Sequence, residues 1–206
     1  MQVSPTIQGA KVILRREALA RRDALPPAER ARAAEIIAAR AFPVAVAAGT
    51  IVSGFSPMKS EINPLPLLRK LADAGAQLAL PAVVGNGKPL IMRAWNFGEP
   101  LAAGVWGIRE PKAEAPEVAP DILLVPLLAF DRRGHRIGYG AGYYDMTITA
   151  LRARKPITAV GIAFAAQEID AVPNTLRDAR LDLVLTEKEI VMPEPLIEEI
   201  SPKHRP

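Results

Sequence analysis

The segment Asp121-Ile-Leu-Leu-Val-Pro126 constrains the fold most strongly, because its four central residues are all apolar. A strand with one face in water alternates apolar and polar residues, whereas a strand covered on both faces is apolar throughout. Such strands belong to parallel sheets with helices packed on their faces. The segment therefore predicts an α/β protein.

The remaining elements alternate in type along the chain. Asn63 followed by Pro64 predicts the start of a helix that ends at Gly75, with Asn63 as the N-cap and Pro64 as the first helical residue. Other helices are predicted over about 8–24, 28–41 and 142–154, and strands over about 50–55, 77–81, 90–95, 157–163 and 181–185. Strands that alternate with helices predict a layered, largely parallel sheet.

Length and composition narrow the class of protein. The 206 residues suit one domain, in which we expect a helical N-terminal part (1–45), an α/β core (46–190) and a C-terminal tail (191–206). The absence of cysteine excludes disulfides, zinc–thiolate sites and cysteine nucleophiles. No apolar run reaches the roughly 18 residues of a membrane span, and no signal peptide is recognisable at the N-terminus. We expect a cytoplasmic monomer without membrane contacts.

The net charge of +4 is concentrated near the N-terminus. Between Lys11 and Arg32 there are seven basic residues against three acidic ones. This surplus could contact phosphates on a nucleotide, on a polyanionic tail or on nucleic acid, and a solvated helix face explains the charge equally well. No aromatic residues alternate with these arginines to stack on bases, which disfavours nucleic acid as the partner.

A glycine-rich segment over residues 130–145 carries most of the chemical information. Gly138, Gly140 and Gly142 alternate there, so the backbone could approach a ligand closely and offer N–H groups to phosphate oxygens. The following helix adds the partial positive charge of its N-terminus. Arg136 offers a forked donor for phosphate, and Asp145 a carboxylate for Mg2+. All three tyrosines of the chain, Tyr139, Tyr143 and Tyr144, lie in this segment.

The glycine spacing alone does not identify the ligand. It lacks the G-x-G-x-x-G pattern of dinucleotide-binding folds, which disfavours a dehydrogenase, and the Gly-Lys-Ser/Thr of a P-loop. A structural turn packed by aromatic residues would produce the same spacing. The spacing therefore leaves both a phosphate site and a structural turn open.

The complete string resembles the 5-formyltetrahydrofolate cyclo-ligase family. The chain reads Pro126-Leu-Leu-Ala-Phe-Asp131, then Gly134, then Arg136-Ile-Gly-Tyr-Gly-Ala-Gly-Tyr-Tyr-Asp145. The resemblance extends over nearly the whole length. It also includes Lys11-x-x-x-Arg15, Phe55-Ser-Pro-Met58 with Glu61, Val105-Trp-Gly-Ile-Arg-Glu-Pro111, Val160-Gly-Ile-Ala-Phe164, Gln167, Val172-Pro173, Asp178-x-x-x-Asp182 and Thr186-Glu187.

The resemblance implies a fold and a reaction. The fold would be a three-layer α/β/α arrangement with a largely parallel sheet, related to sugar-phosphate isomerase and CoA-transferase-like domains. The reaction would convert 5-formyltetrahydrofolate, including its polyglutamylated forms, to 5,10-methenyltetrahydrofolate with ATP as co-substrate and Mg2+ as cofactor. It would need no protein nucleophile, so catalysis would rest on positioning and charge neutralisation.

The resemblance also assigns roles to residues. Arg136 and Tyr144 would be catalytic, and Asp145 and Asp182 would hold the metal. ATP would be bound by Lys11, Arg15, Arg136, Gly138, Tyr139, Gly140, Gly142, Tyr143 and Tyr144. The folate would be bound by Ser56, Met58, Glu61, Trp106, Tyr139 and Tyr143.

The chain departs from the family pattern at Thr175 and Arg177, where many members have other residues before Asp178. This leaves two rival interpretations. One is a divergent member that binds ATP but acts on another folate or pterin. The other is a non-catalytic protein that binds a nucleotide or folate, or that holds RNA on its basic helix.

Overall fold

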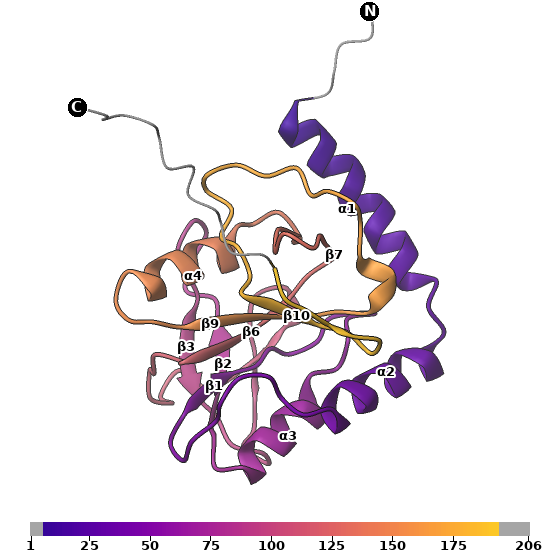
Figure 1. Cartoon of the computed structure of the whole chain (residues 1–206). Coiled ribbons are helices and arrows are strands. Elements are labelled where there is room, and N and C mark those ends of the chain that lie inside the picture. Colours follow the sequence, from indigo (N-terminus) through magenta and orange to yellow (C-terminus); the bar gives the residue numbers. More distant parts are fainter. Residues whose placement is uncertain (1–5, 194–206) are drawn as a thin grey trace, which may run out of the picture.

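A seven-stranded sheet forms the centre of the computed structural model, which describes residues 6–193 apart from the side chain of Trp106 (Figure 1). The strand order is β11-β10-β9-β6-β1-β2-β3. The five inner strands are mutually parallel: β1 (Ile51–Ser53), β2 (Gln77–Ala82), β6 (Ile122–Pro126), β9 (Thr158–Ile162) and β10 (Leu183–Leu185). The edge strands β3 (Ile91–Ala94) and β11 (Ile190–Val191) are antiparallel to their neighbours. The predicted α/β class with a mostly parallel sheet is confirmed.

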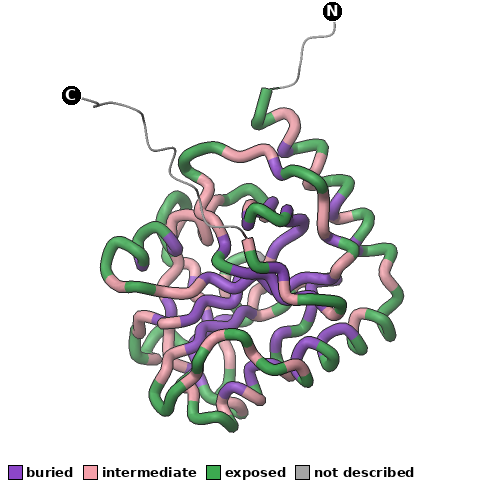
Figure 2. Tube along the Cα trace, in the orientation of Figure 1, coloured by how far each residue is buried: buried purple, intermediate pink, exposed green. Residues whose placement is uncertain are grey.

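Helices cover both faces of the sheet. α2 (Pro27–Ala39) and α3 (Leu65–Asp73) pack on one face together with Ile122 and Leu124 of β6. α4 (Tyr143–Arg152) packs on the other face with Leu123 and Val125 of the same strand. Figure 2 shows the buried residues gathered along the sheet between the helices. The uninterrupted apolar run of β6 is explained by this burial on both sides.

The first helix has a different position. α1 (Ile7–Asp23) packs through Ala18 on Leu128, Ala129, Ile137 and Val172, in segments that follow the carboxyl ends of the strands. Thr6 caps the helix, since its hydroxyl accepts a hydrogen bond from the N–H of Gly9 at 3.2 Å. α1 therefore lies over the end of the sheet where α/β proteins bind ligands, and not in one of the two helical layers.

The predicted elements agree with the structure to within a few residues at their ends. The helix expected from Pro64 begins one residue later, with Pro64 at the N-cap, although the Asn63 side chain still accepts a hydrogen bond from the N–H of Leu65 at 3.1 Å. Gly75, which follows this helix, has a φ of +99° that few other residues adopt. Lys70 supports the neighbouring α2 by donating to the carbonyl oxygens of residues 38 and 40.

Several short elements were not predicted. Two small hairpins pair β4 (Ala102–Ala103) with β5 (Arg109–Glu110) and β7 (Ala129–Phe130) with β8 (Arg136–Ile137). Two 3-10 helices, η1 (Val105–Gly107) and η2 (Ala165–Gln167), and the edge strand β11 complete the described chain. Of the predicted tail, residues 194–206 lie outside the described residues. No helix within residues 6–193 is long and apolar enough to cross a membrane.

Candidate active site

A buried aspartate organises the β7–β8 hairpin that opens the glycine-rich segment. Asp131 is fully buried, and its carboxylate accepts hydrogen bonds from the N–H groups of Arg133, His135 and Val172 at 2.9–3.0 Å. Burial raises the pKa of Asp131, but these hydrogen bonds, the Arg133 side chain and His135 outweigh it, so the pKa lies below its ordinary value. The hairpin is thus fixed to the 170s loop that contributes to the site.

The glycines have the backbone conformations that their role requires. Gly140 and Gly142 have φ values of +105° and +71°, and Gly142 is the N-cap of α4. No cap side chain bonds the first turn of α4, so its N–H groups are not taken up by the capping residue. Arg15 of α1 donates from Nε to the carbonyl oxygen of Gly138 at 3.0 Å. The predicted proximity of the basic helix and the glycine loop is therefore present.

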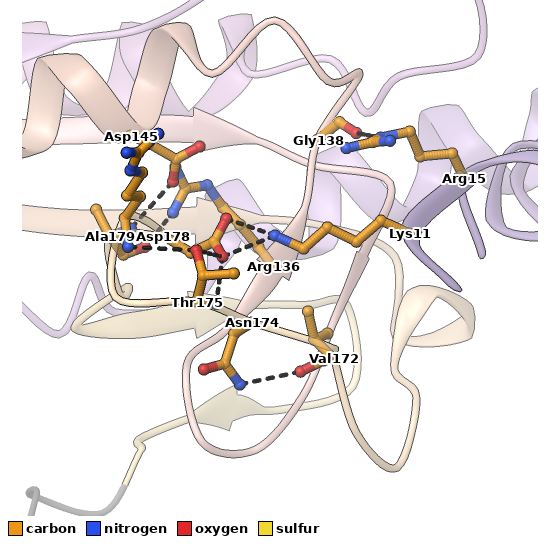
Figure 3. Close-up of polar contacts among 11 residues, drawn as sticks. Lys11, Arg15, Arg136, Gly138, Asp145, Val172, Asn174, Thr175, Asp178 and Ala179 are labelled. Atoms are coloured by element: carbon orange, nitrogen blue, oxygen red, sulfur yellow. Dashed lines mark hydrogen bonds and ion pairs between the residues drawn. The ribbon is translucent and has the colours of Figure 1, made fainter. Parts of the chain in front are cut away.

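Lys11 makes a partly buried ion pair in the same region (Figure 3). Its Nζ lies 2.6 and 2.7 Å from the two carboxylate oxygens of Asp178. Thr175 also donates to this carboxylate, from its N–H at 2.6 Å and from its hydroxyl at 2.9 Å. Burial raises the pKa of Asp178, but the bonds from Lys11 and Thr175 outweigh burial, so the pKa lies below its ordinary value. The departure at Thr175 thus contacts the acid that pairs with Lys11, whereas the Arg177 side chain is exposed.

Arg136 and Asp145 form a second pair, beside Ala179 (Figure 3). One terminal nitrogen of Arg136 donates to Oδ1 of Asp145 at 2.7 Å, and the other donates to the carbonyl oxygen of Ala179. The N–H of Ala179 donates to the same Oδ1 at 3.0 Å. The Arg136 side chain is only 4% exposed, so the guanidinium expected to face phosphate instead holds Asp145 in place.

The structure does not bring Asp182 to Asp145. Oδ2 of Asp182 accepts hydrogen bonds from Arg152 at 2.8 Å and from the N–H of Ala159 at 2.7 Å, at the amino ends of β9 and β10. Asp145 lies in the first turn of α4 and Arg152 ends that helix, about 10 Å away along the axis. The expectation that both aspartates hold one metal is therefore not supported. Asp182 ties two strands to a helix instead.

Glu61, which is expected to bind the folate, contacts Met58 and Arg22. Oε2 of Glu61 accepts a hydrogen bond from the N–H of Met58 at 2.7 Å, and Oε1 lies 3.8 Å from Nη1 of Arg22. Arg22 also donates to the Tyr139 hydroxyl at 2.7 Å. Burial raises the pKa of Glu61 above its ordinary value, although the Met58 N–H, the Arg22 charge and the Tyr139 hydroxyl each lower it.

Glu61 also lines a cavity of about 210 Å³ between α2 and the start of α3. Its other lining residues are Arg30, Ala31, Ala34, Glu35, Asn63 and Pro66. Oε1 of Glu61 has no hydrogen-bond partner among the described residues, although the side chain is buried. A buried carboxylate oxygen without a partner beside a cavity is suited to accept a donor from a ligand.

The remaining expected residues are placed as follows. The Ser56 hydroxyl donates to the carbonyl oxygen of Arg109 at 2.5 Å, which joins the 55–61 loop to β5. Trp106 lies in η1, and its side chain is outside what the structure describes. Tyr143 and Tyr144 begin α4, and Tyr144 packs partly on the core of that face. Burial raises the pKa of the Tyr144 phenol, which stays neutral.

Comparison with known proteins identifies the family of this chain. The model of the 5-formyltetrahydrofolate cyclo-ligase family matches residues 7–187. The chain belongs to this family. The 5-formyltetrahydrofolate cyclo-ligase of Escherichia coli K12 is 31% identical over 180 residues, which cover 82% of this chain and 96% of that protein. The protein of the same name from Mycolicibacterium smegmatis is 36% identical over 149 residues, or 68% and 75% of the two chains.

Solved structures agree with this family membership. The 5,10-methenyltetrahydrofolate synthetase of Aquifex aeolicus superposes with a TM-score of 0.74 at 29% identity, covering 94% of this chain and 99% of that one. The synthetase of Mycoplasma pneumoniae has a TM-score of 0.68 at 22% identity, which supports the fold alone. The predicted family, fold class and ligase class are confirmed.

A magnesium ion fits the cyclo-ligase site through Asp145. Its Oδ1 is held by Arg136 and Ala179, and the side chain is 28% exposed, so the carboxylate is accessible to an ion. No group of three or more acidic, histidine or cysteine side chains in that range could hold a metal. Mg2+ commonly takes one or two carboxylates and completes its shell with water and phosphate oxygens. One carboxylate beside a phosphate site is therefore sufficient.

Two residues important to the site were missed by sequence reasoning. Asp131 was included only as part of the motif, and Arg22 only as one of the seven basic residues between Lys11 and Arg32. For Arg22 a signal existed, because Lys11, Arg15, Ala18 and Arg22 follow one another at intervals of three and four. That spacing places Arg22 on the same face of α1 as the expected phosphate ligands.

Proposed function

We propose that the chain converts 5-formyltetrahydrofolate to 5,10-methenyltetrahydrofolate, with ATP as co-substrate and Mg2+ as cofactor, releasing ADP and phosphate. The observation that carries the proposal is the position of Tyr139. It belongs to the glycine loop, and through Arg22 it is joined to Glu61. A nucleotide on the loop and a folate ring at Glu61 would therefore lie next to each other.

The nucleotide would be held by groups that now bond one another. Lys11 and Arg15 would turn from Asp178 and the Gly138 carbonyl toward phosphate oxygens, and the first turn of α4 would offer its N–H groups. Asp145 would hold Mg2+, which when bound neutralises phosphate charge. Arg136 would keep Asp145 oriented from its buried position.

The folate would be oriented by Glu61. Its ionised carboxylate can accept paired N–H bonds from the aminopyrimidine edge of the ring, and the cavity beside it gives space for a planar heterocycle. Met58 would fix the carboxylate through its N–H, and Met58, Ser56 and Trp106 would contact the folate where it extends beyond this cavity. Tyr139 and Tyr143 would lie between the two ligands.

The chemistry then needs positioning more than a protein base. The formyl oxygen attacks the γ-phosphorus, its P–O bond forms, and the bond to ADP breaks. N10 of the folate attacks the activated formyl carbon and closes the ring. The C–O bond breaks with its electron pair going to phosphate, and the proton of N10 leaves with that phosphate. Lys11 and Arg15 stabilise the charge on the transferred group.

The direct test measures the absorbance of methenyltetrahydrofolate in the complete mixture of protein, 5-formyltetrahydrofolate, ATP and Mg2+. We expect the band to grow only when all components are present. A flat trace from folded protein that binds ATP would contradict the proposal and favour a divergent member with another substrate. Salt-sensitive RNA binding without ATP turnover would favour the non-catalytic alternative.

A variant of Glu61 tests the folate site specifically. Glu61→Gln keeps one acceptor but loses the charge, so we expect the KM for 5-formyltetrahydrofolate to rise about tenfold or more. The KM for ATP should stay within about twofold of the wild type, since the nucleotide contacts other residues. Glu114→Gln, at an exposed position, serves as the matched control. Equal kinetics in the two variants would remove Glu61 from the site.

A further inference from the structure

Arg22 is a buried charge that the reaction as proposed above does not use directly. Its side chain is 1% exposed, although it belongs to the basic segment that would suit a solvated helix face. Nε donates to the Ser60 hydroxyl at 3.0 Å, and Nη2 donates to the Tyr139 hydroxyl at 2.7 Å. Nη1 lies 3.8 Å from Oε1 of Glu61. One guanidinium therefore joins α1 to both the 55–61 loop and the glycine loop.

The pairing between Arg22 and Glu61 is incomplete. Nη1 of Arg22 and Oε1 of Glu61 are two of the three buried side-chain polar atoms within residues 6–193 that have no hydrogen-bond partner. A buried polar atom without a partner lowers stability, and apolar residues of similar volume often stabilise a core as well as a buried ion pair does. Packing alone therefore does not explain an arginine at this position.

We propose that Arg22 is a positioning residue. It holds the Glu61 carboxylate and the Tyr139 hydroxyl in fixed positions relative to each other, so that the folate ring at Glu61 lies correctly next to the nucleotide on the glycine loop. The inference rests on the proposed function. Its geometric basis is the fork of the guanidinium, whose separate nitrogens face Tyr139 and Glu61. A lysine would supply the charge, but its single ammonium nitrogen could not face Tyr139 and Glu61 from two separate positions.

Arg22 also determines the charge state of Glu61. The other groups near Glu61 are the Tyr139 and Tyr144 phenols, Arg30 and Glu35 around the cavity, and Asp23, which accepts a hydrogen bond from Ser60. Arg22 is the one cation among them that is buried against the carboxylate. Burial raises the pKa of Glu61, and the Arg22 charge lowers it. Removing this charge should therefore raise the pKa of Glu61.

The first experiment uses the protein without ligands, so that it does not depend on the proposed reaction. The pKa of Glu61 is measured by carbon-13 NMR of the side-chain carboxyl groups, with the Glu61 signal assigned by its loss in Glu61→Gln. We expect Arg22→Gln to raise this pKa by about one unit or more. Arg16→Gln removes a charge from an exposed position of the same helix and should leave it unchanged.

The second experiment measures kinetics. In Arg22→Gln we expect the KM for 5-formyltetrahydrofolate to rise about tenfold or more, with the KM for ATP within about twofold of the wild type. The loss should be larger at lower pH, because Glu61 must be ionised to bind the ring. Arg22→Lys should keep the pKa of Glu61 close to the wild-type value and still bind folate weakly, because its ammonium does not span both partners.

The outcomes separate the two proposals. An unchanged pKa of Glu61 in folded Arg22→Gln, with kinetics equal to those of Arg16→Gln, would overturn the role of Arg22. If Arg22→Gln does not fold, the inference is tested by Arg22→Lys and Tyr139→Phe, whose effects on the KM for folate should be non-additive; additive effects would overturn it. If the pKa of Glu61 is raised in Arg22→Gln but the wild type forms no methenyltetrahydrofolate, the proposed reaction is refuted and the role of Arg22 in holding Glu61 is not.

Discussion

For single residues, burial is the property that the sequence predicted least well. Lys11, Arg22, Asp131 and Arg136 are charged but buried, and each is paired with groups far away in the sequence. Sequence reasoning identified the residue types of the glycine loop because the motif is local. It did not separate Arg22 from the exposed arginines next to it, because the groups that bury it belong to the 58–61 loop and to Tyr139.

Asp131 carries a prediction about stability. Its carboxylate accepts several hydrogen bonds in a fully buried position, so Asp131→Asn should lower the free energy of unfolding by about 2–4 kcal/mol at neutral pH. The pKa of Asp131 is lowered in the folded state, so its contribution is present above the unfolded value of about 4 and is lost as the pH falls through the folded value.

Urea denaturation of the wild type and Asp131→Asn at pH 7 and pH 3 checks this sign. The difference in free energy between the two proteins should shrink at the lower pH. Asp170→Asn, at an exposed position, should stay within about 0.5 kcal/mol of the wild type. A difference that stays constant with pH would show that Asp131 does not act through its charge.

At the scale of elements, regular patterns over many residues could be predicted, and short paired segments could not. The continuous run of β6 and the helical spacing of α1 reflect burial that repeats along the element. The β7–β8 hairpin has two residues per strand and is held by Asp131, so no periodicity marks it. Asp182 was expected at the start of its strand and lies there, directly before β10. The sequence did not show that Asp182 pairs with Arg152 at the end of α4, whereas Asp145 lies in the first turn of that helix.

The separation of the two aspartates gives a prediction about metal dependence. Asp145→Asn should raise the Mg2+ concentration for half-maximal activity about tenfold or more, because it removes the charge of the carboxylate proposed to hold the metal. Asp182→Asn should leave that concentration within about twofold of the wild type and lower stability by less than about 1 kcal/mol. Titration of activity with Mg2+ checks both variants. Equal shifts in the two would mean that Asp182 reaches the metal.

The glycine loop gives a prediction about backbone conformation. At Gly140, φ is +105°, and an added Cβ would lie 3.2 Å from the guanidinium of Arg15. Gly140→Ala should therefore lower stability by about 1–2 kcal/mol and also raise the KM for ATP about tenfold, since it displaces Arg15.

A second glycine with a positive φ serves as a control, because it has the same backbone strain when substituted but no contact with Arg15. Gly87 has a φ of +69° in the turn between β2 and β3, and an added Cβ would meet nothing within 4 Å. Gly87→Ala should lower stability to a similar degree and leave the KM for ATP unchanged. Calorimetry measures the stability of both variants, and initial-rate kinetics measure their KM for ATP. A raised KM for ATP in Gly87→Ala would contradict the explanation that Gly140→Ala acts by displacing Arg15.

For the whole molecule, the most important feature is that α1 joins the two parts of the site. It packs on the segments after β6 and β9, contacts Asp178 and Gly138 through Lys11 and Arg15, and reaches Glu61 through Arg22. The sequence showed a basic helix before the α/β core, and the family resemblance assigned Lys11 and Arg15 to the ligand of the glycine loop, but the contact of this helix with Glu61 was not predicted. Docking depends on side chains from four separate loops, which only the folded chain brings together.

This arrangement predicts that ATP stabilises α1 together with the glycine loop. A ligand that binds only the folded state adds stability in proportion to the logarithm of its concentration, about 2.7 kcal/mol at 100 times its Kd. Hydrogen exchange with ATP and Mg2+ should therefore slow both around residues 11–15 and over residues 138–145, by more than in α2 and α3, which cover another face of the sheet. The doubly substituted Lys11→Gln, Arg15→Gln should lose this added protection, whereas Arg16→Gln, Arg32→Gln removes two exposed charges and should keep it. Protection confined to residues 138–145 would mean that the nucleotide binds without α1, and the charges of that helix would then have to serve another ligand.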